Sequence, residues 1–263
     1  MTLFLSDLHL GRGTAEESRA AERDAVALLR TYEEQILEEG GALYLLGDVF
    51  EQYMEYKYLV PKGFARLQGL LAEWTDRGIP VTYMVGNRDP WHLDYFEREL
   101  GVRIVHETLD ETAEGLLIHV AHGDGLVPHE WFYNRIRRLL RNRFVARLYR
   151  MTLPGDSAFA LARWVVRRFG SEGSSHEVTV EALRRYAEAA LSRAETELVV
   201  LGHCHRGACI PMAGGAYLNP GYWFADRTFG YLDSSGPALF RWSGGRAEPL
   251  APSESASHLA LVS

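Results

Sequence analysis

The 263-residue chain carries 28 basic and 35 acidic side chains, and its formal charge of -7 argues against a protein that binds nucleic acid over its whole surface. Its 47% hydrophobic content is typical of a globular protein with a large core, and no apolar run of about 20 residues predicts a membrane span. No signal peptide precedes the first predicted strand, and Cys204 and Cys209 match no disulfide framework. We therefore expect a reducing, cytoplasmic location.

Strands and helices alternate along the sequence. Apolar runs predict strands and helical spacing predicts helices, in the order strand 3–6, helix 16–39, strand 43–46, helix 63–77, strand 80–85, strands 103–105 and 115–121, and strand 197–201. The strand at 43–46 is apolar at every position, the pattern of a central strand covered on both faces. This alternation favours an α/β protein.

Several of these strands end in a loop that carries Asp, Asn or His. The side chains concerned are Asp7, His9, Asp48, Asn87, His122, His203 and His205. Because strands that lie side by side in one sheet bring their carboxyl-end loops together, we expect these side chains to converge. Imidazole and carboxylate groups suit Mn, Fe, Zn and Ni. Seven candidate ligands exceed the need of one ion, so the pattern predicts two divalent ions that share a carboxylate, and phosphoester hydrolysis.

The ordered motifs resemble those of the calcineurin-like metallophosphoesterases. They are D-x-H at Asp7 and His9, GDxxE at 47–51, GN-x-D at 86–89, H-G-D at 122–124 and GH-x-H at 202–205. The resemblance implies a four-layer αββα sandwich, with two packed sheets flanked by helices. It also implies one ion held by Asp7, His9, Asp48 and His205, and a second held by Asp48, Asn87, His122 and His203, with Asp48 bridging them.

Arg88 departs from the general family pattern. Most of these enzymes have at this place a histidine that protonates or steadies the leaving oxygen. Arginine stays charged at any working pH, so we expect Arg88 to clamp phosphate oxygens instead. With GNRD, H-G-D and a helical insertion, the chain resembles the UDP-2,3-diacylglucosamine diphosphatases of lipid A synthesis. That branch implies attack by metal-activated hydroxide on the uridine-side phosphorus, giving UMP and 2,3-diacylglucosamine 1-phosphate, with manganese as the usual metal.

The same resemblance assigns further roles. Catalysis is expected to depend on Asp48, Asn87 and Arg88. Substrate contacts are expected from Asn87, Arg88, Glu130 and Tyr133, the last two standing eight and eleven residues after His122. Asp124 is expected to orient the ring of His122, and Asp89 to hold its loop and Arg88.

Residues 131–170 interrupt the strand-helix alternation with two predicted helices that break at Pro154 and Gly155. Apolar residues recur there every four positions among the arginines Arg135, Arg137, Arg138, Arg141, Arg143, Arg147 and Arg150. This segment either forms a lid that holds acyl chains and rests on the cytoplasmic face of the inner membrane, or is an ordinary packed helix pair with a solvated arginine face. We expect one domain over 1–250 with this insertion, and a loosely ordered tail over 251–263.

Two other functions are compatible with the motifs. A related phosphodiesterase or phosphatase acting on a soluble nucleotide or nucleotide conjugate needs the same ligands, but Arg88 and the arginine-rich insertion argue against it. A non-catalytic scaffold on this fold would be expected to lose ligands, whereas this chain has all of them. The sequence therefore predicts a UDP-linked diacylglucosamine lipid as substrate, contact with the membrane surface, and neither nucleic acid nor an obligate protein as partner.

Overall fold

The computed structural model describes residues 1–126, 141–169, 176–193 and 195–251. The predicted substrate residues Glu130 and Tyr133 lie outside the described residues, as does the predicted tail from residue 252 onward. Among the described residues, no helix is both long and apolar enough to cross a membrane.

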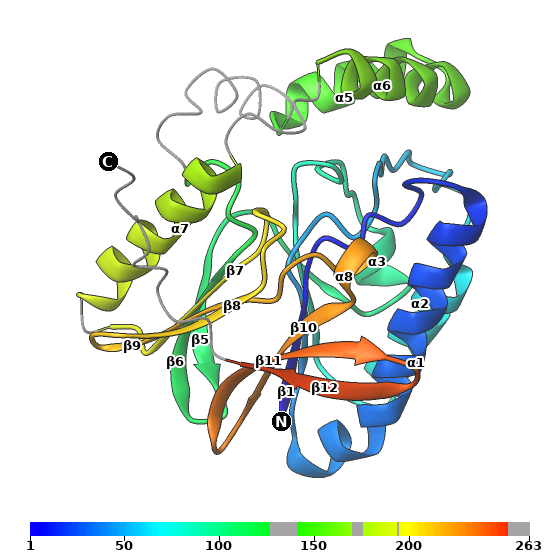
Figure 1. The fold of residues 1–263 in the computed structure, drawn as a ribbon. Helices are drawn as coiled ribbons and strands as arrows, with labels where there is room; N and C mark the ends of the chain where they lie inside the picture. Colours follow the sequence, from blue (N-terminus) through cyan, green and yellow to red (C-terminus); the bar gives the residue numbers. More distant parts are fainter. Residues whose placement is uncertain (127–140, 170–175, 194, 252–263) are drawn as a thin grey trace.

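A seven-stranded sheet forms one layer of the fold (Figure 1). Its strand order is β12 (Arg246–Leu250), β11 (Gly236–Ser243), β10 (Thr228–Asp233), β1 (Thr2–Leu5), β2 (Leu43–Leu45), β3 (Val81–Met84) and β4 (Arg103–Val105). Strands β1 to β4 are parallel to one another, and β10 to β12 add an antiparallel edge.

A five-stranded sheet forms the second layer. Its order is β5 (Leu109–Ala113), β6 (Leu116–Ala121), β7 (Leu198–Leu201), β9 (Gly215–Asn219) and β8 (Ala208–Met212). Strands β6, β7 and β9 are parallel, so β6 and β7 end at the same edge of this sheet.

Helices cover the outer faces of both sheets. Helices α1 (Ala15–Glu39) and α2 (Ala65–Asp76) pack on the seven-stranded sheet, and α7 (His176–Leu191) packs on the five-stranded sheet. The short helices α3 (Tyr95–Arg98) and α8 (Trp223–Asp226) lie in connections. Helices α5 (Arg143–Thr152) and α6 (Gly155–Phe169) stand together at one end of the molecule (Figure 1). The layers are therefore αββα, as the family resemblance implied.

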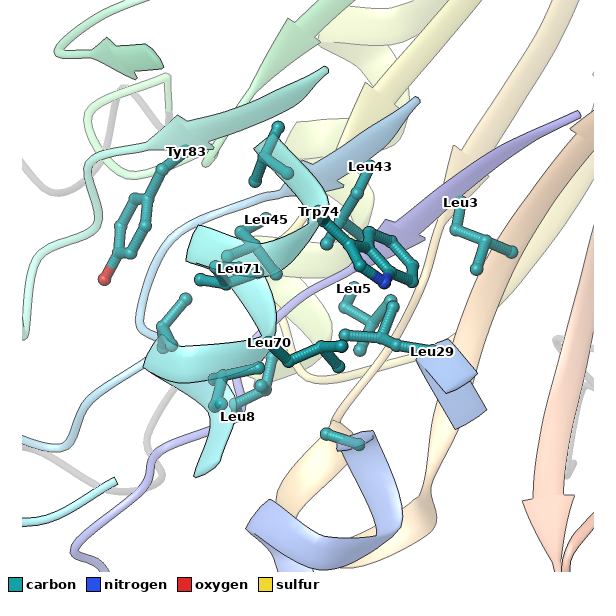
Figure 2. Close-up of a cluster of buried hydrophobic side chains, with 14 of the residues drawn as sticks. Leu3, Leu5, Leu8, Leu29, Leu43, Leu45, Leu70, Leu71, Trp74 and Tyr83 are labelled. Atoms are coloured by element: carbon teal, nitrogen blue, oxygen red, sulfur yellow. The ribbon is translucent and has the colours of Figure 1, made fainter. Parts of the chain in front are cut away.

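The alternation of side chains between the two faces of each strand explains this layering. In β1, Leu3 and Leu5 face the helices, whereas Phe4 belongs to the core between the sheets. Figure 2 shows α2, with Leu70 and Trp74, packed over the strands of the seven-stranded sheet. Because successive strand side chains point to opposite faces, strands that are apolar at every position can fill two cores.

The observed elements extend and correct the prediction. The sequence did not indicate β5, α3 or α7, and the second predicted helix begins at Ala65 rather than at 63. The long helix was predicted correctly: Thr14 and Glu17 form its capping box and Gly40 ends it in a left-handed conformation. In the insertion, the helices on either side of Pro154 match the predicted break.

Candidate metal centre

The predicted ligands come together where both sheets end. Asp7 and His9 follow β1, Asp48 follows β2 and Asn87 follows β3, whereas His122 follows β6 and His203 and His205 follow β7. The expectation that a single sheet would align these loops is therefore wrong. The two sheets pack face to face through Phe4, Leu46 and Val200, among others, and this packing brings the two sets of loops together.

Asp7, His9 and His205 form the first group of facing ligand atoms. Nδ1 of His9 lies 2.8 Å from Oε2 of Glu51, so in the neutral ring this nitrogen carries the proton and Nε2 is the atom that can bind a cation. Nε2 of His9 lies 3.1 Å from Nε2 of His205, and Oδ1 of Asp7 lies 3.2 Å from the latter atom. Ligand atoms about 2.1 Å from one ion are spaced by about 3 Å, so this group suits one cation.

The two oxygens of Asp7 differ in their surroundings. Oδ2 accepts hydrogen bonds from Oγ of Ser6 at 2.5 Å and from the backbone N–H of His203 at 3.0 Å. Oδ1 is buried and faces two ring nitrogens, Nε2 of His205 at 3.2 Å and Nε2 of His9 at 3.6 Å. A buried carboxylate charge is costly unless a cation or a protonated imidazole compensates it. Asp7 therefore fits a metal ligand that uses Oδ1.

Asp7, Asp48 and His122 form the second group of facing ligand atoms, so Asp7 belongs to both groups, and Asn87 lies beside His122. Oδ1 of Asp48 lies 3.7 Å from Nε2 of His122, while Oδ2 of the same carboxylate lies 3.8 Å from Nε2 of His9. Oδ1 of Asn87 lies 3.1 Å from Nε2 of His122. Asp48 thus presents one oxygen to each group, which is the arrangement a bridging ligand requires.

Two histidines of the second group are fixed by buried contacts. Nδ1 of His122 lies 2.6 Å from the carbonyl oxygen of Leu46, which directs Nε2 toward Asp48. The ring of His203 lies edge-on to that of His122, with centroids 5.1 Å apart. Burial, and then the charge of His122, lower the pKa of His203 to about 4. His203 is therefore neutral near pH 7, the form in which imidazole binds metals.

The carboxylates place a negative charge at the first group. Burial raises the pKa of Asp7. The charge of His205 and the hydrogen bonds from His205 and His9 outweigh burial and hold the pKa of Asp7 well below its usual value. Burial lowers the pKa of His9, but its hydrogen bonds to Asp7 and Glu51 outweigh burial and raise the pKa to about 9. The site therefore favours a positive charge between these side chains.

Strained backbone conformations are concentrated at the candidate metal ligands. Positive φ angles, which side-chain-bearing residues adopt only at a cost, occur at Asp7 (54°), His9 (42°), Asp48 (50°), His203 (70°) and His205 (52°). Each such residue costs on the order of 1–3 kcal/mol, and strain of this kind is typical of functional sites.

Glu51 has a central position that the sequence analysis did not assign, although it noted the GDxxE motif. Besides His9, its carboxylate binds Nε of Arg12 at 3.1 Å and Nη1 of Arg88 at 3.4 Å. Tyr222 was also missed: its ring stacks on His205 with centroids 4.3 Å apart and an angle of 8°, and its hydroxyl accepts a hydrogen bond from Arg12 at 2.6 Å. The only signal for Tyr222 was its place directly after the turn at Asn219–Gly221.

Arg88 and Asp89 hold the loop after β3. The backbone N–H of Arg88 donates to Oδ1 of Asp48 at 2.7 Å, and its guanidinium lies beside Glu51. Asp89 is buried and accepts hydrogen bonds from the backbone N–H of Gly86 at 2.9 Å and the hydroxyl of Tyr83 at 2.5 Å. Asp89 thus shapes the loop that carries Asn87.

Asp124 makes an ion pair that the sequence did not indicate. Both of its carboxylate oxygens accept hydrogen bonds from Nη2 of Arg141, at 3.1 and 3.0 Å. The ring of His122, which Asp124 was expected to orient, is held through Nδ1 by the carbonyl of Leu46.

Comparison with known proteins gives several curated relatives and no matching family model. The chain is 30% identical to the UDP-2,3-diacylglucosamine hydrolase of Ralstonia nicotianae, over 77% of this chain and 76% of that protein. It is 35% identical to the protein of the same name from Porphyromonas gingivalis, over 62% of this chain and 58% of that protein. It is 29% identical to that from Nitrosococcus oceani, over 79% of each.

Solved structures give weaker matches. An archaeal phosphodiesterase is 12% identical with a TM-score of 0.47, over 95% of this chain and 99% of that one. Vacuolar Protein Sorting 29 from Cryptosporidium parvum is 13% identical with a TM-score of 0.44, over 95% and 94% of the two chains.

Proposed function

The chain belongs to the UDP-2,3-diacylglucosamine hydrolase family, and on that premise we propose that it hydrolyses UDP-2,3-diacylglucosamine to UMP and 2,3-diacylglucosamine 1-phosphate in lipid A synthesis. The observation that carries the proposal is the placement of Asp48, whose Oδ2 lies 3.8 Å from Nε2 of His9 and whose Oδ1 lies 3.7 Å from Nε2 of His122. An arrangement of this kind is suited to cleaving a phosphoanhydride bond.

Two divalent cations are part of this proposal. Asp7, His9, Asp48 and His205 would hold one, and Asp48, Asn87, His122 and His203 the other. The buried Oδ1 of Asp7, which faces Nε2 of both His205 and His9, supports a cation there. The donor set of imidazole and oxygen atoms suits manganese. When bound, the cations would acidify a water molecule and neutralise charge on the phosphate.

The side chains of this chain would do the remaining work. Arg88 would bind non-bridging phosphate oxygens as a fixed charge, because a guanidinium does not give up its proton near pH 7. In this structure its Nη1 lies 3.4 Å from Oε1 of Glu51, and its side chain is 16% exposed. The leaving sugar phosphate is already a stable anion and needs no histidine acid. Asn87 would contact the attacked phosphate, and Glu130 and Tyr133 would contact the substrate from outside the described residues.

Helices α5 and α6 support contact with a lipid surface. On their inner side, Ala146 and Ala158 pack with Met54 and Trp91. On their outer side large apolar side chains are exposed, among them Phe144 (74%), Met151 (73%) and Trp164 (58%). Exposed large apolar groups on two adjacent helices mark an interaction surface.

Exposed basic residues accompany this apolar surface. Arg147 is exposed on α5, and Lys57 is exposed in the segment that contacts Leu153 through the hydroxyl of Tyr56. Basic and apolar groups together favour binding to anionic lipid headgroups. We therefore place the protein at the cytoplasmic face of the inner membrane as a peripheral protein, where its lipid substrate would be reached.

A direct test is hydrolysis of UDP-2,3-diacylglucosamine by the purified protein after chelation and manganese add-back, beside bis-p-nitrophenyl phosphate as a generic diester. We expect manganese-dependent release of UMP and poor cleavage of the generic ester. Asp48→Ala should reduce both activities by at least about a hundredfold, since it removes the shared ligand. Turnover that persists in Asp48→Ala would contradict the two-cation arrangement, and cleavage of the generic ester alone would contradict the substrate.

A further inference from the structure

Arg141 joins the insertion to the loops of the candidate metal centre. It lies just before α5, and its side chain is only 10% exposed. Nη2 donates to the carbonyl oxygens of Val85 at 2.9 Å and Gly86 at 3.2 Å, and to both oxygens of Asp124. Nη1 donates to the carbonyl oxygen of His106 at 2.8 Å. One guanidinium thus contacts three separate loops of the fold.

The contacted atoms adjoin two proposed ligands of the same cation. Gly86 directly precedes Asn87, and Asp124 follows His122 by two residues. Oδ1 of Asn87 and Nε2 of His122 lie 3.1 Å apart, although their strands belong to different sheets. Backbone hydrogen bonds of a shared sheet cannot set this spacing. The carbonyl oxygen of Leu46 holds the ring of His122, and Arg141 in addition binds the backbone of one ligand loop at Gly86 and the side chain of Asp124 in the other.

The chemistry of the contact requires arginine. A guanidinium presents five N–H donors in a rigid plane and can bind a carboxylate and several carbonyls at once, whereas a lysine ammonium is a single charged point. The charge of Arg141 is compensated by Asp124, which is itself buried. Removing one partner of such a buried pair leaves the other uncompensated, so the geometry of the loop at Asp124 depends on Arg141.

We propose that Arg141 is a positioning residue. It belongs to the insertion, and it completes the half of the metal centre that contains Asn87 and His122. It fixes the distance between the two ligand loops, and so makes cation binding at this half depend on the docking of the insertion onto the core. The inference deepens the proposed function and rests on it for the identity of the reaction. It does not depend on the lipid part of the substrate, because every contact involved lies in the core or next to it.

Manganese titration of the chelated protein by calorimetry tests this inference without any substrate. We expect Arg141→Ala and Arg141→Lys to weaken one of two manganese sites by about 10- to 100-fold and to leave the other within about twofold. Arg98→Ala, a variant of an exposed arginine on α3, serves as the control and should bind manganese like the wild type. Manganese affinities unchanged in Arg141→Lys would overturn the proposal. This variant keeps the charge and carries the test if Arg141→Ala does not fold.

Kinetics with bis-p-nitrophenyl phosphate provide a second readout. At a manganese concentration that saturates the wild type, we expect kcat of Arg141→Ala to fall by at least about tenfold with KM changed by less than about twofold, and added guanidinium to restore part of kcat. A purely structural loss would not respond to guanidinium, and that result would overturn the proposal. If UDP-2,3-diacylglucosamine is not a substrate, the proposed function fails while the manganese titration still decides the role of Arg141.

Discussion

The Nε2 atoms of His9 and His205 lie 3.1 Å apart, each directed at the other across the entrance to a buried aspartate. Nδ1 of His9 lies 2.8 Å from Oε2 of Glu51, so Nε2 of the neutral ring is the atom that can bind a cation. Two such nitrogens at this distance are best satisfied by a shared cation, with Oδ1 of Asp7 as a third ligand.

Cation binding should therefore stabilise the fold. We expect manganese to raise the free energy of unfolding by about 2.7 kcal/mol per site when the free manganese concentration is a hundred times the Kd. The chelated protein should therefore unfold at a lower urea concentration than the manganese-loaded protein. Urea denaturation with and without manganese measures this difference. Asp7→Asn should lose much of the stabilisation, and a variant that keeps all of it would contradict the role of Asp7.

Glu51→Gln tests the carboxylate that orients His9. A neutral amide holds the Nδ1 proton of His9 less strongly and weakens the contacts to Arg12 and Arg88. We expect manganese affinity to fall by about 10- to 100-fold, with a smaller loss in Glu51→Asp. Titration calorimetry measures the affinity. The exposed Glu38→Gln on α1 is the control, and equal affinities of Glu51→Gln and Glu38→Gln would refute the assignment.

Gly86→Ala tests the close packing around Asp48. A Cβ at Gly86 would collide with Oδ1 and the backbone nitrogen of Asp48, and neither can move without shifting the proposed bridging ligand. We expect activity on bis-p-nitrophenyl phosphate to fall by at least about tenfold. Gly69→Ala is the matched control: it lies in α2 with open space around the added methyl, and should stabilise the protein by about 0.5–1 kcal/mol. Wild-type activity in Gly86→Ala would show that the site tolerates displacement of Asp48.

His92 should make the stability of the protein depend on pH. Its ring is buried between aromatic side chains, with Tyr53 stacked on it at 4.5 Å, and neither ring nitrogen has a hydrogen-bond partner among the described residues. Burial, and then the charge of His106, lower the pKa of His92 from 6.5 to about 3. Below pH 6.5 the unfolded chain therefore binds a proton that the folded chain does not, and stability is lost as the pH falls toward 3.

The matching variant is His92→Phe, which keeps the aromatic contacts and cannot titrate. Between pH 7.5 and pH 5 the wild type should lose about 2 kcal/mol more stability than this variant. Urea unfolding of both proteins at the two pH values gives the difference directly, and any constant packing effect of phenylalanine cancels. Parallel pH dependences in the two proteins would exclude His92 as the cause.

The exposed apolar side chains of α5 should govern membrane binding. Phe144→Ser combined with Met151→Ser removes two groups that are 74% and 73% exposed. We expect sedimentation with anionic phospholipid vesicles to fall by at least about tenfold, while cleavage of the generic ester is unchanged. Leu117→Ser, an exposed apolar residue on β6, is the control. Equal vesicle binding by the double variant and this control would argue for a surface that serves another purpose.

The sequence by itself determined the candidate ligands and the local elements. Buried strands are apolar at every position, and loops that carry Asp7, Asp48, Asn87 and His122 directly follow them, so these side chains could be named from strand pattern and motif alone. Helix α1 was predictable because its cap, its apolar spacing and its terminal Gly40 are all local signals.

Only the tertiary structure decided how the ligands meet and what holds them. The two halves of the centre come from different sheets, and the contacts of Glu51, Tyr222 and Arg141 join residues far apart in the chain. A local pattern records which face of a strand or helix is apolar. It does not record which surfaces pack together, because that depends on the complementary shapes and charges of both partners.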